Sequence, residues 1–274
     1  NEINSKIKLK LSDVNFKLNI SNFEFEVETI DPLIAINEKE IDLAIIKFDL
    51  NIFEYLNNKN PITKISIISK ENDINQVIDF INEYDFNIAR NLILKQIKKG
   101  KVKISSEISF DQKKSNKLKY LVNGSVSDAE VKILDKIKAE KIKFDFIIDH
   151  DFINLNDIEL IFDKILITSD KVKISKVNNQ FEIEGNLKTE KKKINLFNYS
   201  KLIFEKLDIL DNQPIDLSSK NSFSFKISDK FKVNDLKINS KLNFDELFTK
   251  SKYQDLIYLK NGDIFIDYSK DELD

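Results

Sequence analysis

The sequence predicts a mainly β fold with few helices. Polar and apolar residues alternate along most of the chain, which is the period of a strand with one buried face and not the period of a helix. The clearest case is residues 141–149 (KIKFDFIID), where Ile142, Phe144, Phe146 and Ile148 fall on one strand face and mostly charged residues on the other. A hydrophobic content of 41% over 274 residues can supply a substantial buried surface.

The alternation predicts about fifteen strands, more than a compact sandwich needs. In order, they are residues 7–11, 16–20, 23–27, 41–50, 62–68, 102–110, 118–126, 131–134, 142–148, 158–168, 172–175, 181–187, 223–227, 233–244 and 264–268. Such strands make a sheet with one apolar face and one polar face that is exposed to solvent.

Two helical insertions are predicted, near residues 74–98 and 196–210. Asp73 is a plausible N-cap for the first, which ends before Gly100, and the second stops before Pro214. Each helix has one apolar stripe, and neither polar face is strongly basic. We therefore expect both helices to pack over an end or edge of the sheet.

The charge balance gives no reason to expect a nucleic-acid partner. Lys and Arg number 44 against 46 Asp and Glu, so the net charge is -2. The basic runs at 98–101 and 191–193 are interpreted as solvated loops or strand edges. The chain has no cysteine, which excludes disulfides and thiolate metal sites.

No signal peptide or membrane-spanning run is visible, and the chain does not begin with Met. We therefore expect a single segment, residues 1–274, of a longer chain whose anchor or export signal lies outside this sequence.

No enzyme motif is present, and we predict a protein without catalytic residues, metal or cofactor. The single histidine, His150, lies between Asp149 and Asp151 directly after a strand, where a polar turn is the favoured interpretation. No second histidine or cysteine could complete a zinc site. The closest glycines, Gly100 and Gly124, are too far apart in sequence for a phosphate-binding loop.

A weak internal similarity links residues 120–126 (YLVNGSV) with residues 181–187 (FEIEGNL). Each has a glycine, Gly124 or Gly185, inside a strand pattern, and such a glycine commonly marks a bulge or bend. These are the places where the sheet is expected to curl.

The glycine-marked strands resemble the AsmA-like family of bacterial envelope proteins. The resembling stretches are residues 99–110 (KGKVKISSEISF), 120–134 (YLVNGSVSDAEVKIL), 181–196 (FEIEGNLKTEKKKINL) and 231–244 (FKVNDLKINSKLNF). The resemblance implies an elongated, curled antiparallel β-sheet that forms a hydrophobic groove. It also implies a periplasmic protein, anchored to the inner membrane, that helps to move phospholipids toward the outer membrane. This sequence lacks the family's N-terminal anchor helix and full length.

Apart from the resemblance, the residue pattern itself leads us to expect that the apolar face binds lipid. The apolar face of so many strands needs a partner, and too little helix is available to cover it. Acyl chains gain about 0.8 kcal/mol per buried CH₂, so they can fill that role. The alternative is a closed sandwich or barrel whose apolar face is its own core, in a non-catalytic structural or adhesive β-rich surface protein.

The expected partners are phospholipid acyl chains, with inner- and outer-membrane proteins at the ends of the groove. The residues predicted to line it are Val102, Ile104, Ile108, Phe110, Ile142, Phe144, Phe146, Ile148, Phe223, Phe225 and Ile227.

Overall fold

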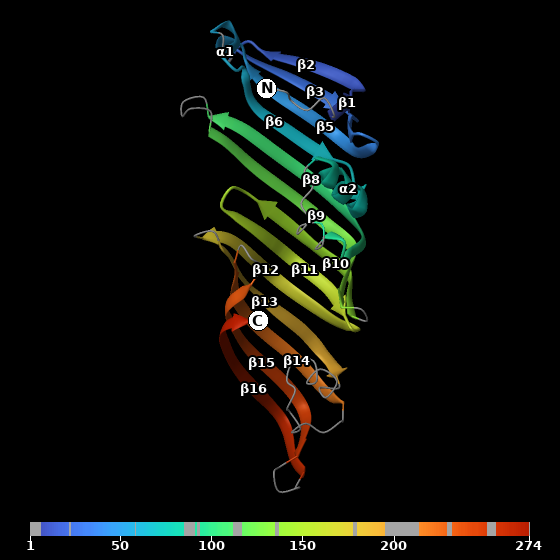
Figure 1. Ribbon diagram of the computed structural model, residues 1–274, viewed down its shortest axis with the longest axis vertical. Coiled ribbons are helices and arrows are strands. Elements are labelled where there is room, and N and C mark those ends of the chain that lie inside the picture. The colour runs from blue at the N-terminus through green and yellow to red at the C-terminus, as the bar shows by residue number, and fades with distance from the viewer. Residues whose placement is uncertain are drawn as a thin grey trace. The chain divides into compact units, whose positions relative to one another are not determined.

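A computed structural model describes residues 7–21, 23–57, 59–84, 91, 94–111, 117–134, 137–177, 180–194, 214–228, 232–250 and 256–273. Over these residues the protein is mainly β, and sixteen strands form one antiparallel sheet that is not closed (Figure 1). The prediction of a mainly β, antiparallel fold with few helices is confirmed. The chain divides into two compact units, Asn1–Leu155 and Asn156–Asp274, and the division falls inside β11 (Phe152–Phe162).

The strands of the first unit pair in the order β1-β4-β5-β6-β8-β9-β10. The long strand β5 pairs with β3 over one half and with β4 over the other, β2 extends β3, and the short β7 pairs with β8. Their bounds are β1 (Ile7–Lys10), β2 (Asp13–Asn19), β3 (Glu24–Ile30), β4 (Leu33–Ile36), β5 (Lys39–Asn51), β6 (Ile62–Ser69), β7 (Asn72–Asp73), β8 (Ile97–Asp111), β9 (Lys117–Leu134) and β10 (Ile137–Ile148).

The first unit contains two helices, α1 (Ile52–Leu56) and α2 (Ile74–Tyr84). Helix α1 was not predicted; it is a single turn whose first amides, those of Phe53 and Glu54, donate to the side chain of Asn51.

Helix α2 begins where the sequence predicts it. The Asp73 carboxylate accepts a hydrogen bond of 2.8 Å from the backbone N–H of Asn75, as an N-cap does. The expected extent to residue 98 is wrong at its end, because Ile97 and Lys98 already belong to β8, in which Ile97 is opposite Val131 of β9. Residues 85–90 and 92–93 of that range, and the whole predicted helix at 196–210, lie outside the described residues.

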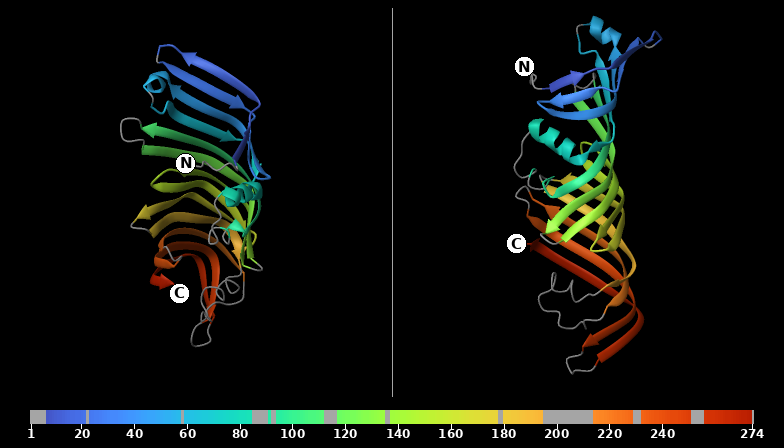
Figure 2. Two further views of the ribbon diagram at one scale, coloured as in Figure 1. Left: turned by 45° about the horizontal axis from the view of Figure 1, so that its top comes forward. Right: turned by 90° about the vertical axis from the view of Figure 1, so that its right-hand side faces the viewer.

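Helix α2 lies against one face of the sheet and contacts β4, β5 and β8 (Figure 2). Val77 of the helix is buried, as are Ile36, Leu43 and Val102 of these strands. Since the buried residues are apolar and the neighbouring Lys101 is exposed, the helix covers the apolar face at this end.

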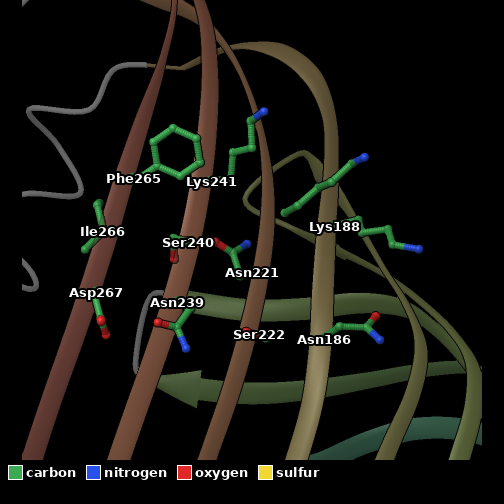
Figure 3. A pocket seen from close by; sticks show the side chains of 11 residues that line it. Asn186, Lys188, Asn221, Ser222, Asn239, Ser240, Lys241, Phe265, Ile266 and Asp267 are labelled. Atoms are coloured by element: carbon green, nitrogen blue, oxygen red, sulfur yellow. The ribbon is translucent and has the colours of Figure 1, made fainter.

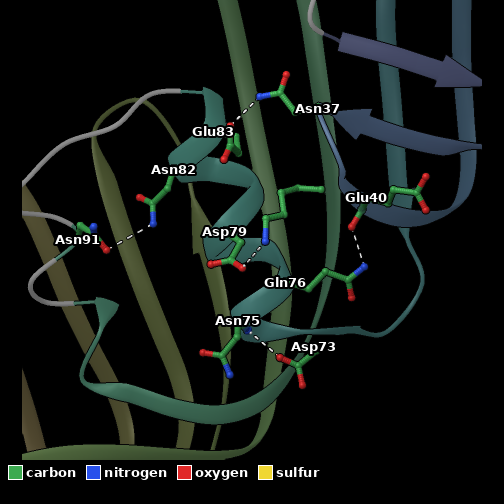
Figure 4. Close-up of polar contacts among 10 residues, drawn as sticks. Asn37, Glu40, Asp73, Asn75, Gln76, Asp79, Asn82, Glu83 and Asn91 are labelled. Carbon is green, nitrogen blue, oxygen red and sulfur yellow. Dashed lines mark hydrogen bonds and ion pairs between the residues drawn. The ribbon is translucent and has the colours of Figure 1, made fainter.

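Polar side chains also hold α2 on the sheet. They join the exposed side of the helix to the β4–β5 hairpin, so the helix position is fixed by more than its apolar stripe. The contacts are Asn37 Nδ2 to Glu83 Oε2 at 2.7 Å, Lys39 Nζ to Asp79 Oδ2 at 3.1 Å, and Gln76 Nε2 to the Glu40 carbonyl oxygen at 2.6 Å (Figure 4).

The strands of the second unit follow one another in sequence order, each antiparallel to the next: β12 (Ile165–Val177), β13 (Gln180–Ile194), β14 (Ile215–Ile227), β15 (Val233–Lys250) and β16 (Leu256–Leu273). The single strand predicted at 158–168 is wrong. Asp163 and Lys164 both have positive φ, 45° and 66°, and form the two-residue turn between β11 and β12. Such a turn needs positive φ at both central positions, and Asp-Lys lacks the usual Gly or Asn that would reveal it.

Candidate functional site

Apolar side chains stand in rows across β8, β9 and β10 of the first unit. Val102 is directly opposite Val126, which is opposite Phe144. Cross-strand partners point to the same face of a sheet, so each row lies on one side. The neighbouring rows of that face are Ile104–Gly124–Phe146, Ser106–Val122–Ile148, Ile108–Tyr120 and Phe110–Leu118, and Ile142 is opposite Ala129. The eight candidate residues of the first unit therefore share one face.

The exposure of these rows changes along the strands. Val102 and Ile142, near the end that α2 covers, are 6% and 9% exposed. Ile104, Phe144 and Phe146 are only partly buried, as are Ile108, Phe110 and Ile148. An apolar surface thus runs from a closed end beneath the helix to an accessible part beyond it.

The same face continues across β6, β5, β3 and β2, and none of the residues predicted to line the groove lies on these strands. Ile108 is opposite Ile65, and the row goes on through Phe48 and Val27 to Phe16. Phe16 is 64% exposed. The signal that could have identified these residues is the same alternation that located their strands.

In the second unit, Phe223, Phe225 and Ile227 share one face of β14, as predicted. Phe223 is opposite Gly185 on one side and Ile238 on the other, and Phe225 is opposite Ile183. The rings of Phe223 and Phe225 are stacked with centroids 6.0 Å apart.

Polar residues interrupt this face farther along β14. Ser219 and Asn221 lie between Leu217 and Phe223 on the same side of the strand. The Ser219 hydroxyl is 3.0 Å from the Thr189 hydroxyl, and Asn221 Nδ2 donates to Ser219 Oγ at 2.9 Å. The apolar face of the second unit is therefore divided along β14 by hydrogen-bonded polar side chains.

The opposite face of the first unit carries charges in cross-strand ion pairs. Lys47 Nζ lies 2.6 Å from Glu26 Oε2, and Lys17 Nζ lies 3.1 Å from Glu26 Oε1. Hydrogen bonds from Lys47 and then Lys17 lower the pKa of Glu26, and the bond to Glu26 raises the pKa of Lys47. The two faces of this sheet are thus chemically distinct.

His150 lies in the turn between β10 and β11. The Asp149 carboxylate accepts hydrogen bonds from the backbone N–H groups of Asp151 and Phe152, at 2.8 and 2.9 Å. The carboxylate shapes the turn as the polar-turn interpretation predicts, and the rings of His150 and Tyr120 are nearly perpendicular, with centroids 6.3 Å apart. Among the described residues, no group of three or more His, Cys, Asp or Glu side chains could hold a metal ion.

Comparison with known proteins gives no match, whether to family models, to curated proteins or to solved structures. In the part of the chain that the structure describes, no helix is long and apolar enough to cross a membrane.

Proposed function

We propose that the apolar face binds phospholipid acyl chains, and that the chain is a segment of an envelope protein that helps to move phospholipids between inner and outer membranes. The observation that carries the proposal is the set of apolar rows that crosses β2 to β10, of which α2 covers only one end. The membrane assignment rests on the resemblance to the AsmA-like family.

Acyl chains fit the chemistry of this face. Each CH₂ group removed from water contributes about 0.8 kcal/mol, so a chain of ordinary length gains several kcal/mol from partial burial. Ile, Val and Phe side chains predominate on this surface, with few hydrogen-bonding groups such as Ser106 and Tyr120, so it makes little demand for a particular ligand shape. On such a surface many small contributions add up to tight binding with little specificity for one acyl chain, as a path for lipid transfer requires.

The open sheet favours this function over a structural protein with a closed core. In the described strands, β2 pairs only with β3 and β16 only with β15, so the sheet does not close on itself. In this proposal the protein is non-catalytic and periplasmic, is anchored to the inner membrane by a segment outside this sequence, and meets membrane proteins at the groove ends.

The proposal is tested by a carboxylate on each face of the same strand. Phe144 lies on the apolar face of β10, and Ile147 lies on the opposite face, across from Asn123. In Phe144→Asp the new carboxylate must lose water whenever a lipid tail binds, at a cost of several kcal/mol, yet it can reach water when the face is empty. We expect Phe144→Asp to lose most of the lipid that co-purifies with the protein, whereas Ile147→Asp keeps it.

Two measurements on both variants separate the outcomes: lipid content by mass spectrometry and the thermal midpoint of unfolding. Unchanged lipid in Phe144→Asp would contradict the acyl-chain proposal. A collapse of the thermal midpoint in Phe144→Asp alone would instead show that Phe144 belongs to a closed core.

A further inference from the structure

Three lysines occupy directly opposed positions on neighbouring strands of the second unit. Lys188 of β13 is opposite Lys220 of β14, which is opposite Lys241 of β15, and Phe265 of β16 completes the row. Neighbouring strands lie about 4.8 Å apart, and like charges directly opposite each other destabilise a sheet. The row therefore concentrates positive charge at a cost to the sheet itself.

The middle lysine of this row has no counter-charge from the sheet. Lys188 pairs with Asp170, and Lys241 Nζ lies 2.9 Å from Asp263 Oδ2. Lys220 is exposed and forms no ion pair with any described residue. Its ammonium group is available to an external anion.

The lysine row borders a hollow of about 430 Å³ on the face opposite to Phe223. Hydrogen-bonding side chains of the adjoining row line the hollow with the lysines: Asn186, Ser222, Asn239 and Asp267 (Figure 3). The lining contains three lysines and one aspartate, and Asp170 and Asp263 pair with two of these lysines, so Lys220 is the cation that an external anion would meet. Amide and hydroxyl groups beside several ammonium groups are the donors that a tetrahedral oxyanion needs.

An exposed aromatic ring adjoins the cations. Phe265 is 73% exposed although it lies on the polar face, and Lys241 Nζ is 5.4 Å from the centroid of its ring. The ring offers a flat apolar surface at the rim of the hollow. A ligand that combines an anion with an organic part matches both features.

We propose that this hollow binds the phosphate group of a phosphate ester, with the ester's organic part against Phe265. Lysine binds phosphate as a point charge, and Lys220 can meet the phosphate between its two neighbours in the row. The site lies on the face of β14 opposite to Phe223 and belongs to the second unit, whereas the apolar rows of β2 to β10 belong to the first, so either proposal can fail without the other.

The experiment titrates the protein with inorganic phosphate, and separately with vesicles of phosphatidylglycerol or of neutral phosphatidylcholine. Phosphorus NMR line broadening reports phosphate binding to the unaltered chain. Because the chain has no tryptophan, Phe265→Trp adds a single fluorescent reporter at the rim. An emission change with inorganic phosphate identifies binding of the free anion, whereas a blue shift with phosphatidylglycerol vesicles alone identifies a lipid headgroup.

Lys220→Gln is the decisive variant, and Lys193→Gln is its control. Both remove one positive charge from the second unit, but Lys193 is opposite Asp216, away from the lysine row. We expect Lys220→Gln to weaken binding of phosphate or of phosphatidylglycerol about tenfold, as loss of a charged hydrogen bond does, and Lys193→Gln to leave it unchanged. Equal weakening by both variants, or no binding in either titration, would overturn the proposal.

Discussion

The ring of Phe146 lies directly against the backbone of Gly124, its cross-strand partner. A Cβ atom on Gly124 would come within 2.3 Å of Phe146 Cζ and 2.5 Å of the Lys103 carbonyl oxygen. Two other strand glycines have the same relationship to an opposed phenylalanine. A Cβ atom on Gly185 would come within 2.9 Å of Phe223 Cζ, and one on Gly262 within 2.6 Å of Phe244 Cζ. Each glycine lets an aromatic ring lie flat on the sheet, which covers the exposed backbone.

Gly124→Ala should therefore destabilise the first unit. The added methyl group must displace both a ring and a neighbouring strand, which costs about 1–3 kcal/mol. Chemical denaturation measures the loss, and Ser125→Ala, on the opposite face, should change stability far less. In the double variant Gly124→Ala/Phe146→Ala the effects should be less than additive, because the smaller side chain removes the clash. Full additivity would show that the ring contact is not the cause.

In the turn after β10, we expect Asp149 and not His150 to be the important residue. Asp149→Ala removes an acceptor from two backbone N–H groups and should cost about 1 kcal/mol, as the loss of a similar cap does. His150→Ala removes only an edge contact with Tyr120 and should leave both stability and lipid binding nearly unchanged. Loss of lipid in a folded His150→Ala variant would contradict the polar-turn assignment.

The two-residue period located most of the strands because it is a local property. It assigned Ile142, Phe144, Phe146 and Ile148 to one face correctly, since alternation within one strand needs no knowledge of its neighbours. It failed at Asp163–Lys164, where the turn has no characteristic residue, and at β4 (Leu33–Ile36), whose four apolar residues show no alternation.

Features that depend on register could not be predicted. Gly124 suggested a bulge, yet it lies in regular pairing between Ile104 and Phe146, and its partner is known only once β9 and β10 are aligned. The lysine row is a stronger example. Lys188, Lys220 and Lys241 are far apart in sequence and unremarkable among 44 basic residues until three strands bring them together.

The Glu26 ion pairs predict how stability changes with pH. The pKa of Glu26 is lower in the folded protein than in the unfolded chain, because Lys47 and Lys17 stabilise its charged form. A lowered carboxyl pKa contributes stability that is present above the unfolded pKa, near 4.3, and is lost as pH falls through the folded pKa. Glu26→Gln should therefore be less stable than the unaltered protein at pH 7, and the difference should shrink as pH falls below about 4.

Urea denaturation at a series of pH values between about 3 and 7 checks this prediction, and Glu24→Gln is the matched control. Glu24 is an exposed carboxylate of the same strand that forms no ion pair with the described residues. Glu24→Gln should therefore leave the decrease of the free energy of unfolding at low pH unchanged. Because the Glu26 pairs lie on the polar face, away from Phe16 and Phe25, the variant should also keep its co-purified lipid. A difference between Glu26→Gln and the unaltered protein that is constant from pH 7 to pH 3 would show that packing, and not the charge of Glu26, is responsible.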